Sequence, residues 1–475
     1  MSKGKLELVK TIILSILIIT SFIQVGILWG YQQHGLPFNF LSALFHDPEA
    51  ARTLDYNKAK NEIFKPSRLI VSEGYDGSRW IIDESESIYN ELWSEGEAYI
   101  KAALSAKPDK VYSLDEWNEK VVRKKAVIFE FDTNISTEIA SWFLKAENVQ
   151  YSELTGIYKV AIRPGEDINS SKMVVYIMDS KELHRYVLPV KELFEKDYDI
   201  ISKNLRSDTK KKSYLAINDK FSNIPVRQDM LFSINSYADY DSIKVSYPED
   251  ISLGSAISSA ERKELADYIL GSEKYSYESY TTNEGAIVYI NVNNIYSMHS
   301  DGVLEYRSRS TNTEEGKGRM NDAFERALEF IYKYKRRQLS SGAELYLSGI
   351  SEEKGVYRFT FDYHVDNIRV HVDYVTNIGG GIVLTNAITI EATSERVEKC
   401  YWLFRSFELL GARNTYNVDF TDLYNRVFSN NEYWQKKFLE AGKKIIISDL
   451  NVSYQLSNRK VEASVRNIVA HQIVN

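Results

Sequence analysis

The stretch that decides the architecture of this chain is Thr11–Gly30, TIILSILIITSFIQVGILWG, in which none of the twenty residues is charged. An α-helix rises about 1.5 Å per residue, so this run spans roughly 30 Å, the thickness of the hydrocarbon core of a bilayer. Lys3, Lys5 and Lys10 precede it, against the single acidic residue Glu7. Positive charge is retained on the cytoplasmic side, so the sequence predicts one membrane-spanning helix with a cytoplasmic amino terminus and about 445 residues outside.

The alternative interpretation of this run is a cleaved signal peptide, which requires a shorter apolar core and a small-x-small cleavage site soon after it. The run instead ends in Leu28-Trp29-Gly30-Tyr31, whose aromatic residues suit the headgroup level, and no cysteine for lipid attachment lies nearby. We therefore expect an uncleaved anchor in the cell membrane, with the bulk of the protein extracytoplasmic.

Polar and small residues inside the anchor form the candidate interaction site. Thr20 and Gln24 are one helical turn apart, and Gly26 and Gly30 repeat that spacing as a small-xxx-small pair. Small residues let a second helix approach closely, and a polar contact between membrane helices contributes roughly 0.6 to 2 kcal/mol. The alternative is that such residues occur in any anchor, because a short GxxxG match is a weak signal. Gln24 is the first choice for contact with another helix.

The chain as a whole has the composition of globular protein, with 44% hydrophobic and 26% charged residues. Its 475 residues suit roughly two to four domains. The net charge of −7 argues against nucleic acid or anionic lipid as a partner, because both attract basic surfaces. Cys400 is the only cysteine, which excludes an intrachain disulfide and a cysteine-rich metal site. An external protein without disulfides is typical of a bacterial surface.

The patterns after the anchor predict an α+β fold of mixed antiparallel sheets and helices. Apolar and polar residues alternate over Val356–Tyr374 on both sides of Asp366-Asn367, which predicts a hairpin with one buried face. A strand is expected over Ile382–Ile390, after a glycine turn, and a helix over Glu395–Leu410. The apolar stripe of that helix consists of Val397, Cys400, Tyr401, Phe404 and Phe407, so a buried, inert thiol is expected.

The central part repeats this unit in outline. Strands are expected over Ile287–Tyr296 and Val303–Arg307, followed by a helix over Asp322–Leu339. A closing segment adds a helix ending at Gly442 and two strands, Lys444–Leu456 and Lys460–Val465.

The predicted organisation of the chain is a cytoplasmic tail over 1–10, the membrane helix over 11–30, a juxtamembrane connection over 31–60, an amino-terminal extracytoplasmic α+β domain over 61–210, a central α+β domain over 213–340 and a carboxy-terminal α+β domain over 341–475. Within the first domain, strands are expected at Leu69–Val71, Trp80–Ile82 and Ala126–Phe129, and a helix at Ser136–Lys145. Ser207–Ser213, which is polar, is the predicted linker.

Catalytic motifs are poorly represented in this sequence. It contains no GxxxxGK[ST], no HExxH and no GxSxG. SxxK occurs outside the membrane at Ser207, Ser351 and Ser457, but no KTG or SDN accompanies these matches. We therefore predict no catalytic residues, no cofactor and a protein that is not an enzyme.

The best metal candidate is the set Asp362, His364, His371 and Asp373, because the hairpin would bring all four to one polar face. The alternative is that these residues are the solvated alternates of an amphipathic strand pair. Arg369 lies among them and would repel a cation. We therefore predict no metal site here.

With these parts in order, the chain resembles the YycH family of membrane-anchored regulators of Gram-positive bacteria. The resemblance is carried by the basic tail and anchor ending in Trp29, by Ile63–Val71 (IFKPSRLIV), by Tyr89–Trp93 (YNELW), by Asp301–Tyr306 (DGVLEY) and by Tyr363–Ile368 (YHVDNI). It covers most of the chain in layout, although residues 430–475 are not matched position by position.

The resemblance implies three external α+β domains, of which the last is similar to the partner protein YycI. It also implies that the anchor associates with the transmembrane helices of an essential sensor histidine kinase and of YycI, and it brings no catalytic residue set. The leading hypothesis is thus a non-enzymatic protein that modulates this kinase of a two-component system controlling cell-wall metabolism. The alternative hypothesis is an extracytoplasmic protein that binds or processes cell-wall material.

Overall fold

A computed structural model describes residues 54–149, 154–163, 172–189, 194–221, 226–227, 229–233, 237–246, 265–267, 269–310, 318–335, 342–376, 378, 381–425, 444–457 and 462–474. All of these residues belong to one compact unit, Thr53–Asn475. The predicted membrane helix and its candidate residues Thr20, Gln24, Gly26 and Gly30 lie outside the described residues. Within them, no helix is long and apolar enough to cross a membrane.

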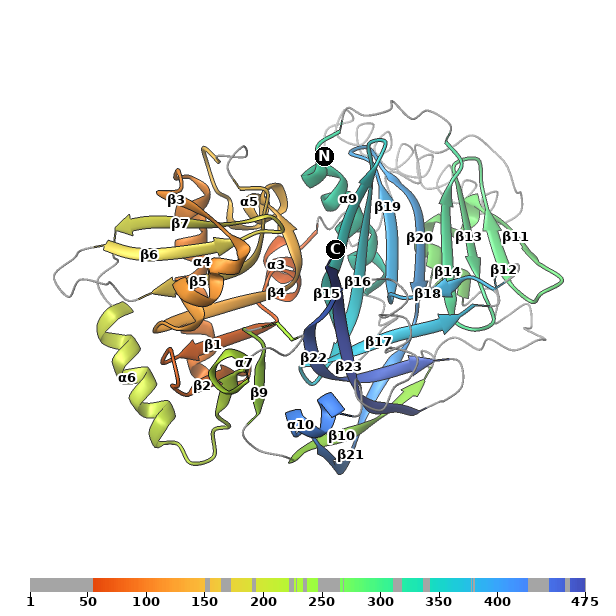
Figure 1. The fold of residues 1–475 in the computed structure, drawn as a ribbon. Coiled ribbons are helices and arrows are strands. Elements are labelled where there is room, and N and C mark those ends of the chain that lie inside the picture. The colour runs from red at the N-terminus through yellow and green to blue at the C-terminus, as the bar shows by residue number, and fades with distance from the viewer. Residues whose placement is uncertain are drawn as a thin grey trace, which may run out of the picture. The chain divides into compact units, whose positions relative to one another are not determined.

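The amino-terminal half of this unit is built on a sheet of nine antiparallel strands, in the order β3-β7-β6-β5-β4-β1-β2-β8-β9 (Figure 1). Its strands are β1 (Arg68–Ser72), β2 (Arg79–Ile82), β3 (Lys110–Ser113), β4 (Ala126–Ser136), β5 (Gly156–Arg163), β6 (Lys172–Met178), β7 (Glu182–Pro189), β8 (Tyr214–Ala216) and β9 (Leu231–Ser233). We call it the first sheet. The predicted strands at 69–71, 80–82 and 126–129 are confirmed.

The first sheet is covered on both faces, which explains why its central strands are nearly continuous apolar runs. Alternate residues of each strand join two different cores. Leu69 and Val127 belong to the main core under the helices, whereas Ile70 and Ile128 belong to a smaller core with Trp117. A strand with a single buried face would instead alternate apolar and polar residues.

The helices of this half are α3 (Tyr56–Ile63), α4 (Ser87–Leu104), α5 (Thr137–Leu144), α6 (Phe194–Ser207) and α7 (Ile217–Lys220), with the short turns η1 (Leu114–Glu116) and η2 (Asn118–Val122). The predicted helix at 136–145 is confirmed, and the Ser136 side chain caps it by accepting a hydrogen bond from Ile139 N. Gly96 lies inside α4 because a Cβ there would lie 2.7 Å from the ring of Phe129. A glycine in a helix costs roughly 1 kcal/mol, and close packing of α4 on β4 offsets that cost.

The second sheet has fourteen strands, of which twelve follow the order β11-β12-β13-β14-β20-β19-β16-β17-β22-β23-β10-β21, while β15 pairs with β16 and β18 with β17. Its strands are β10 (Tyr237–Ser246), β11 (Glu278–Thr281), β12 (Ile287–Ile290), β13 (Asn294–Met298), β14 (Val303–Ser308), β15 (Glu344–Glu353), β16 (Val356–Val365), β17 (Ile368–Val375), β18 (Val383–Leu384), β19 (Ile388–Ala392), β20 (Val397–Leu403), β21 (Ser406–Asn417), β22 (Lys444–Ser457) and β23 (Glu462–Val474). Three helical segments accompany it: η3 (Gly271–Ser276), α9 (Met320–Lys335) and α10 (Phe420–Tyr424).

The predicted central helix is confirmed as α9, which packs on β16, β19 and β20. The ring of Phe324 lies with its centroid 5.1 Å from that of Phe359 on β16. The predicted hairpin is also confirmed. Its turn residues Asp366 and Asn367 have φ angles of 50° and 59°, the left-handed conformation that a two-residue hairpin turn requires.

The predicted helix over Glu395–Leu410 is wrong. These residues form β20 and the start of β21 instead. β20 lies inside the sheet, where its backbone pairs with β14 on one side and β19 on the other. Cys400 and Trp402 are fully buried two residues apart, which is the period of a strand. The segment contains Val, Tyr, Trp and Phe, which favour strands. In so short a run the apolar residues fit both the helical period and the two-residue period of a strand.

The predicted repeat of one unit in the central and carboxy-terminal parts is therefore also wrong. The carboxy-terminal unit ends in strands, whereas the central unit ends in the helix α9. The expected strand at 287–296 is divided into β12 and β13, and that at 382–390 into β18 and β19. The closing strands are confirmed as β22 and β23, whereas the helix ending at Gly442 lies outside the described residues.

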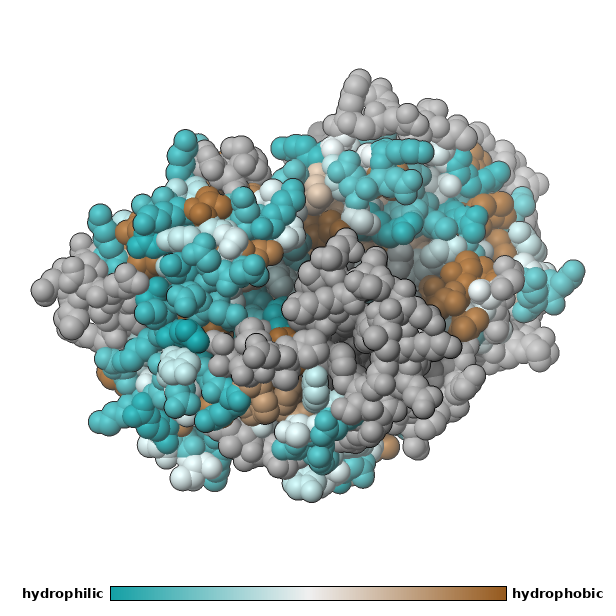
Figure 2. Space-filling model, in the orientation of Figure 1, coloured by the Kyte–Doolittle hydropathy of each residue, from teal (hydrophilic) through white to brown (hydrophobic). Residues whose placement is uncertain are grey.

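Helices and sheets that are antiparallel except for the parallel β17–β22 pair confirm the predicted α+β class of fold. The boundaries at 210/213 and 340/341 stay predictions. β8 and β9 extend the first sheet beyond residue 213, and β14 pairs with β20 across residue 340. In Figure 2 hydrophobic surface residues are scattered among hydrophilic ones, with one group near β18. Val375 and Val383, which pair between β17 and β18, are 47% and 56% exposed.

Candidate functional site

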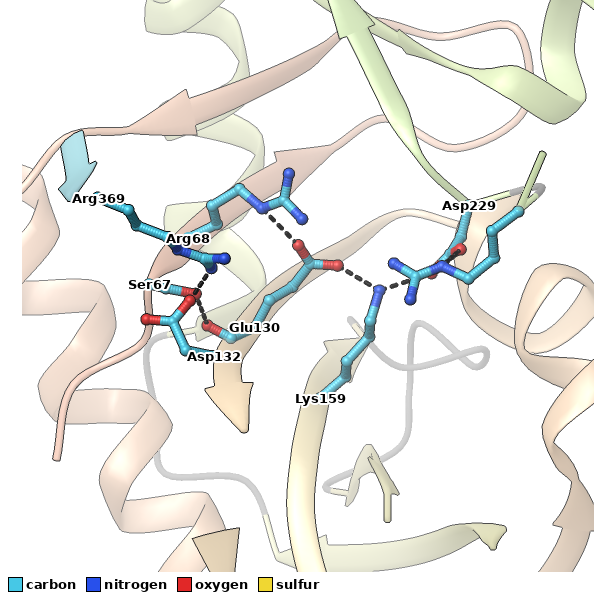
Figure 3. Close-up of polar contacts among 8 residues, drawn as sticks. Ser67, Arg68, Glu130, Asp132, Lys159, Asp229 and Arg369 are labelled. Atoms are coloured by element: carbon cyan, nitrogen blue, oxygen red, sulfur yellow. Dashed lines mark hydrogen bonds and ion pairs between the residues drawn. The ribbon is translucent and has the colours of Figure 1, made fainter. Parts of the chain in front are cut away.

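A row of charged side chains crosses the centre of the first sheet (Figure 3). Glu130 of β4 receives Arg68 Nε at 2.7 Å and Lys159 Nζ at 2.5 Å. Lys159 Nζ also lies 2.6 Å from Asp229 Oδ2, and Arg227 Nε lies 2.5 Å from the other oxygen of Asp229. We call these five residues the ion row.

Strand register brings the first three members of the ion row together. Glu130 lies directly opposite Arg68 on β1 and opposite Lys159 on β5. Facing residues of neighbouring strands have their Cβ atoms about 5 Å apart, within reach of an ion pair. Each of the three is a lone charge in an apolar run (RLIV, IFEF and YKVAI), and that signal could have revealed the row from sequence.

Charge pairing controls the protonation of the ion row. Burial alone would raise the pKa of Glu130, but the cations of Arg68 and Lys159 overcome it and hold the pKa below its usual value. The same balance, with Lys159 and Arg227 as the cations, holds the pKa of Asp229 well below its usual value. Both carboxylates are therefore ionised at neutral pH and are poor general acids or bases there. The geometry favours a structural role.

A second set of contacts, which we call the polar joint, ties this half to the second sheet. Asp132 of β4 pairs with Arg369 of β17 (Figure 3). Glu62 of α3 accepts hydrogen bonds from Tyr332 Oη at 2.7 Å and from Leu345 N at 3.0 Å.

Lys65 completes the polar joint by contacting Glu84 at 2.5 Å and Glu344 of β15 at 2.6 Å. Asp132 reaches the second sheet because β4 leaves its register with β5 between Glu130 and Ile135. In that segment β4 contacts β15.

A cavity of about 500 Å³ lies beside the polar joint. It is lined by the loop between β2 and α4, the start of β15 and the turn of the β16–β17 hairpin, through Glu84, Ser85, Gly342, Ala343, Glu344, His364, Asp366 and Asn367. Sequence reasoning did not bring these segments together, because the loop between β2 and α4 lies more than 250 residues before the other two in the chain.

The four hairpin residues weighed as metal ligands do not share one solvated face. His371 and Asp373 are exposed, but Asp362 is buried and accepts hydrogen bonds from Asn386 Nδ2 and Ala387 N, each at 2.8 Å. Within the described ranges, no group of three or more His, Cys, Asp or Glu residues is placed to hold a metal ion.

His364 is likewise not a solvated residue, since its side chain is 12% exposed and its ring stacks on Tyr346 with centroids 4.2 Å apart. Its Nε2 lies 4.0 Å from the Asp132 carboxylate and has no hydrogen-bond partner in the described part of the chain. Burial, with a smaller contribution from the ammonium of Lys65, lowers the pKa of His364 to about 4. The imidazole is therefore neutral at neutral pH.

Cys400, whose thiol was expected to be buried and inert, is fully buried, although it lies on a strand and not on a helix. Burial raises the pKa of its thiol well above the usual value. A buried thiol with a raised pKa is a poor nucleophile, so Cys400 behaves as part of the core.

Comparison with known proteins gives two matches. Residues 7–210 match the family model for the YycH protein, N-terminal domain. The fold resembles the crystal structure of YycH from Bacillus subtilis, with a TM-score of 0.54 and 14% sequence identity, over 89% of this chain and 97% of that one. No curated protein matches the chain. At this identity, the structural likeness is evidence of a shared fold.

Proposed function

Because the chain belongs to the YycH family, we propose that it is a membrane-anchored, non-enzymatic regulator of a sensor histidine kinase. The kinase belongs to a two-component system that controls cell-wall metabolism. The observation that carries the proposal is the family match over residues 7–210, because it takes in both Thr11–Gly30 and the first sheet up to β7.

In the proposed mechanism, the anchor biases the kinase between two arrangements of its transmembrane helices. A bias requires only unequal contact with the two arrangements. A coupling of roughly 1 to 3 kcal/mol changes such an equilibrium about 5- to 150-fold, and a few interhelical contacts supply it. Gln24, Thr20, Gly26 and Gly30 are the proposed contacts. The protein is proposed to lie in the cell membrane, with its amino terminus in the cytoplasm.

The extracytoplasmic part is proposed to hold the anchor in place and to associate with a YycI-like protein. Its described charges support a scaffold, since the ion row pairs each buried carboxylate with two cations. The polar joint ties the two sheets through ion pairs and hydrogen bonds in addition to their shared core.

Point substitutions in the anchor test this proposal. Gln24→Leu and Gly26→Leu should change expression of the kinase's target genes, because the first removes a polar contact and the second blocks close approach. Ile18→Leu is the matched control, about 120° round the helix from Gln24. Equal output from all three variants, at equal protein level, would contradict the proposed contacts.

A second candidate function is extracytoplasmic binding of cell-wall material. The cavity beside the polar joint favours it, because pockets of roughly 300 to 1,000 Å³ accommodate small ligands. The two candidates differ in where the function lies, in the anchor or in the cavity. A gene position beside a histidine kinase and a response regulator would favour the first.

A further inference from the structure

The cavity beside the polar joint is lined mostly by residues with polar or charged side chains. Six of its eight lining residues carry polar or charged side chains, and only Gly342 and Ala343 do not. Cavities for apolar ligands are lined mainly by hydrophobic and aromatic side chains. These side chains therefore favour a small polar or charged molecule over an apolar one.

Two of the lining carboxylates already hold an ammonium group. Lys65 Nζ lies 2.5 Å from Glu84 and 2.6 Å from Glu344, at the distances of charge-assisted hydrogen bonds. Asp366, in the turn of the β16–β17 hairpin, supplies a third carboxylate of the lining. That side chain is exposed, so it is accessible to a ligand from solvent.

The charges around the cavity leave a negative excess. The carboxylates are those of Glu84, Glu344 and Asp366 in the lining, with Asp83 and Glu86 beside them. The cations that face them are Lys65, Lys211 and Lys212. Five negative and three positive charges sum to −2. The Asp132–Arg369 pair beside His364 adds one charge of each sign, and His364 itself is neutral at neutral pH.

A metal ion does not fit this arrangement, because the described carboxylates and His364 do not converge on one point. A longer organic cation can instead pair its ammonium group with Asp366 and meet Ser85 and Asn367 with its remaining polar atoms. The ring of His364 lines the cavity, whereas its Nε2 is buried and lies 4.0 Å from the Asp132 carboxylate.

We propose that this cavity binds a small organic molecule carrying a primary ammonium group, supplied by a peptide amine or by a polyamine. The bound molecule would bridge the loop between β2 and α4 and the β16–β17 turn. It would thereby link the two sheets at a point where the polar joint already contacts both.

The test is calorimetric titration of the full chain in lipid nanodiscs with two probes, Nα-acetyl-lysine methylamide and putrescine. Both offer a primary ammonium, and Nα,Nε-diacetyl-lysine methylamide is the neutral counterpart. Asp366→Asn removes one lining charge and suits the left-handed turn, because asparagine tolerates positive φ. Asp373→Asn is the matched control on the same hairpin, outside the lining.

At least one amine probe is expected to bind, and which one does so identifies the source of the ammonium. Asp366→Asn should weaken binding about fivefold, as for a partly exposed ion pair, and Asp373→Asn should leave it unchanged. Absence of binding by both amines, equal binding of the diacetylated probe, or equal affinities of the two variants would overturn the proposal. The readout uses no kinase, so it is independent of the function proposed for the anchor.

Discussion

Replacing Lys159 by Met tests the ion row most severely, because it removes the cation that lies between two buried carboxylates. In the native chain the Lys159 side chain is 2% exposed, and those of Glu130 and Asp229 are 9% and 6% exposed. Methionine keeps most of the volume of the lysine side chain but leaves the two carboxylates facing each other without their shared partner.

The expected cost follows from this geometry. Removing one partner of a buried ion pair costs about 3 to 5 kcal/mol. Arg68 still contacts Glu130, and Arg227 still contacts Asp229, so each carboxylate retains one cation. We therefore expect a value at the low end, about 3 kcal/mol.

Hydrogen exchange followed by mass spectrometry measures this cost where it arises. The protection factors of amides in β1, β4 and β5 that exchange by opening of the first sheet should fall about 150-fold. This follows from the cost of about 3 kcal/mol, since 1.4 kcal/mol corresponds to a factor of ten. Lys125→Met is the matched control, because Lys125 is 59% exposed and its pair with Asp199 spans 3.4 Å. An exposed change of this kind costs under about 0.5 kcal/mol. A loss of protection below about fivefold, or equal to that of the control, would refute the structural role of the ion row.

Three further predictions concern other parts of the chain. The mature protein should keep its amino terminus in the cytoplasm and Asn475 outside the cell. This topology would be contradicted by a mature amino terminus beyond Gly30, or by protection of the carboxy-terminal part from external protease. His364 has a folded pKa of about 4, below the ordinary 6.5, so the unfolded state takes up the proton first and stability falls as pH drops from 6.5 to 4. His364→Phe, which keeps a ring against Tyr346, should remove up to about 1.4 kcal/mol per pH unit of that slope in pH-dependent unfolding, and an unchanged slope would show that other groups cause it. Replacing His364 and His371 by Ala should leave the metal content of the purified protein unchanged by elemental analysis, and stoichiometric zinc lost in the double variant would disprove this.

Local patterns predicted the elements whose period is unambiguous. α9 has a sixteen-residue amphipathic pattern, and the β16–β17 hairpin alternates on both sides of a two-residue turn. In each case the sequence alone contains the information, because the buried face and the turn conformation are properties of neighbouring residues.

The β20 strand could not be predicted in this way. Val397, Cys400 and Phe404 have helical spacing, yet pairing with both β14 and β19 decides their conformation. Those partners lie elsewhere in the chain, and tertiary pairing outweighs local propensity in a short segment.

The candidate sites divide in the same way, into features that neighbouring residues predict and features that depend on contacts between distant parts of the chain. The candidate contacts in the anchor follow from composition and spacing, and they stay predictions because they lie outside the described residues. The cavity and the polar joint depend on Lys65 meeting Glu344, which are 279 residues apart. His364 was expected to be solvated, and its burial results from the approach of β4, which no period of the hairpin encodes.

The central claim is that the anchor itself carries the regulatory function, and exchanging the whole anchor tests it most directly. Residues 11–30 are replaced by an unrelated poly-leucine helix of equal length, the rest of the chain is kept, and output of the kinase's target genes is measured at equal protein level. If Thr11–Gly30 makes the contacts that bias the kinase, output should change toward that of a strain lacking the protein. Output identical to wild type would contradict the claim and would place the function in the extracytoplasmic part.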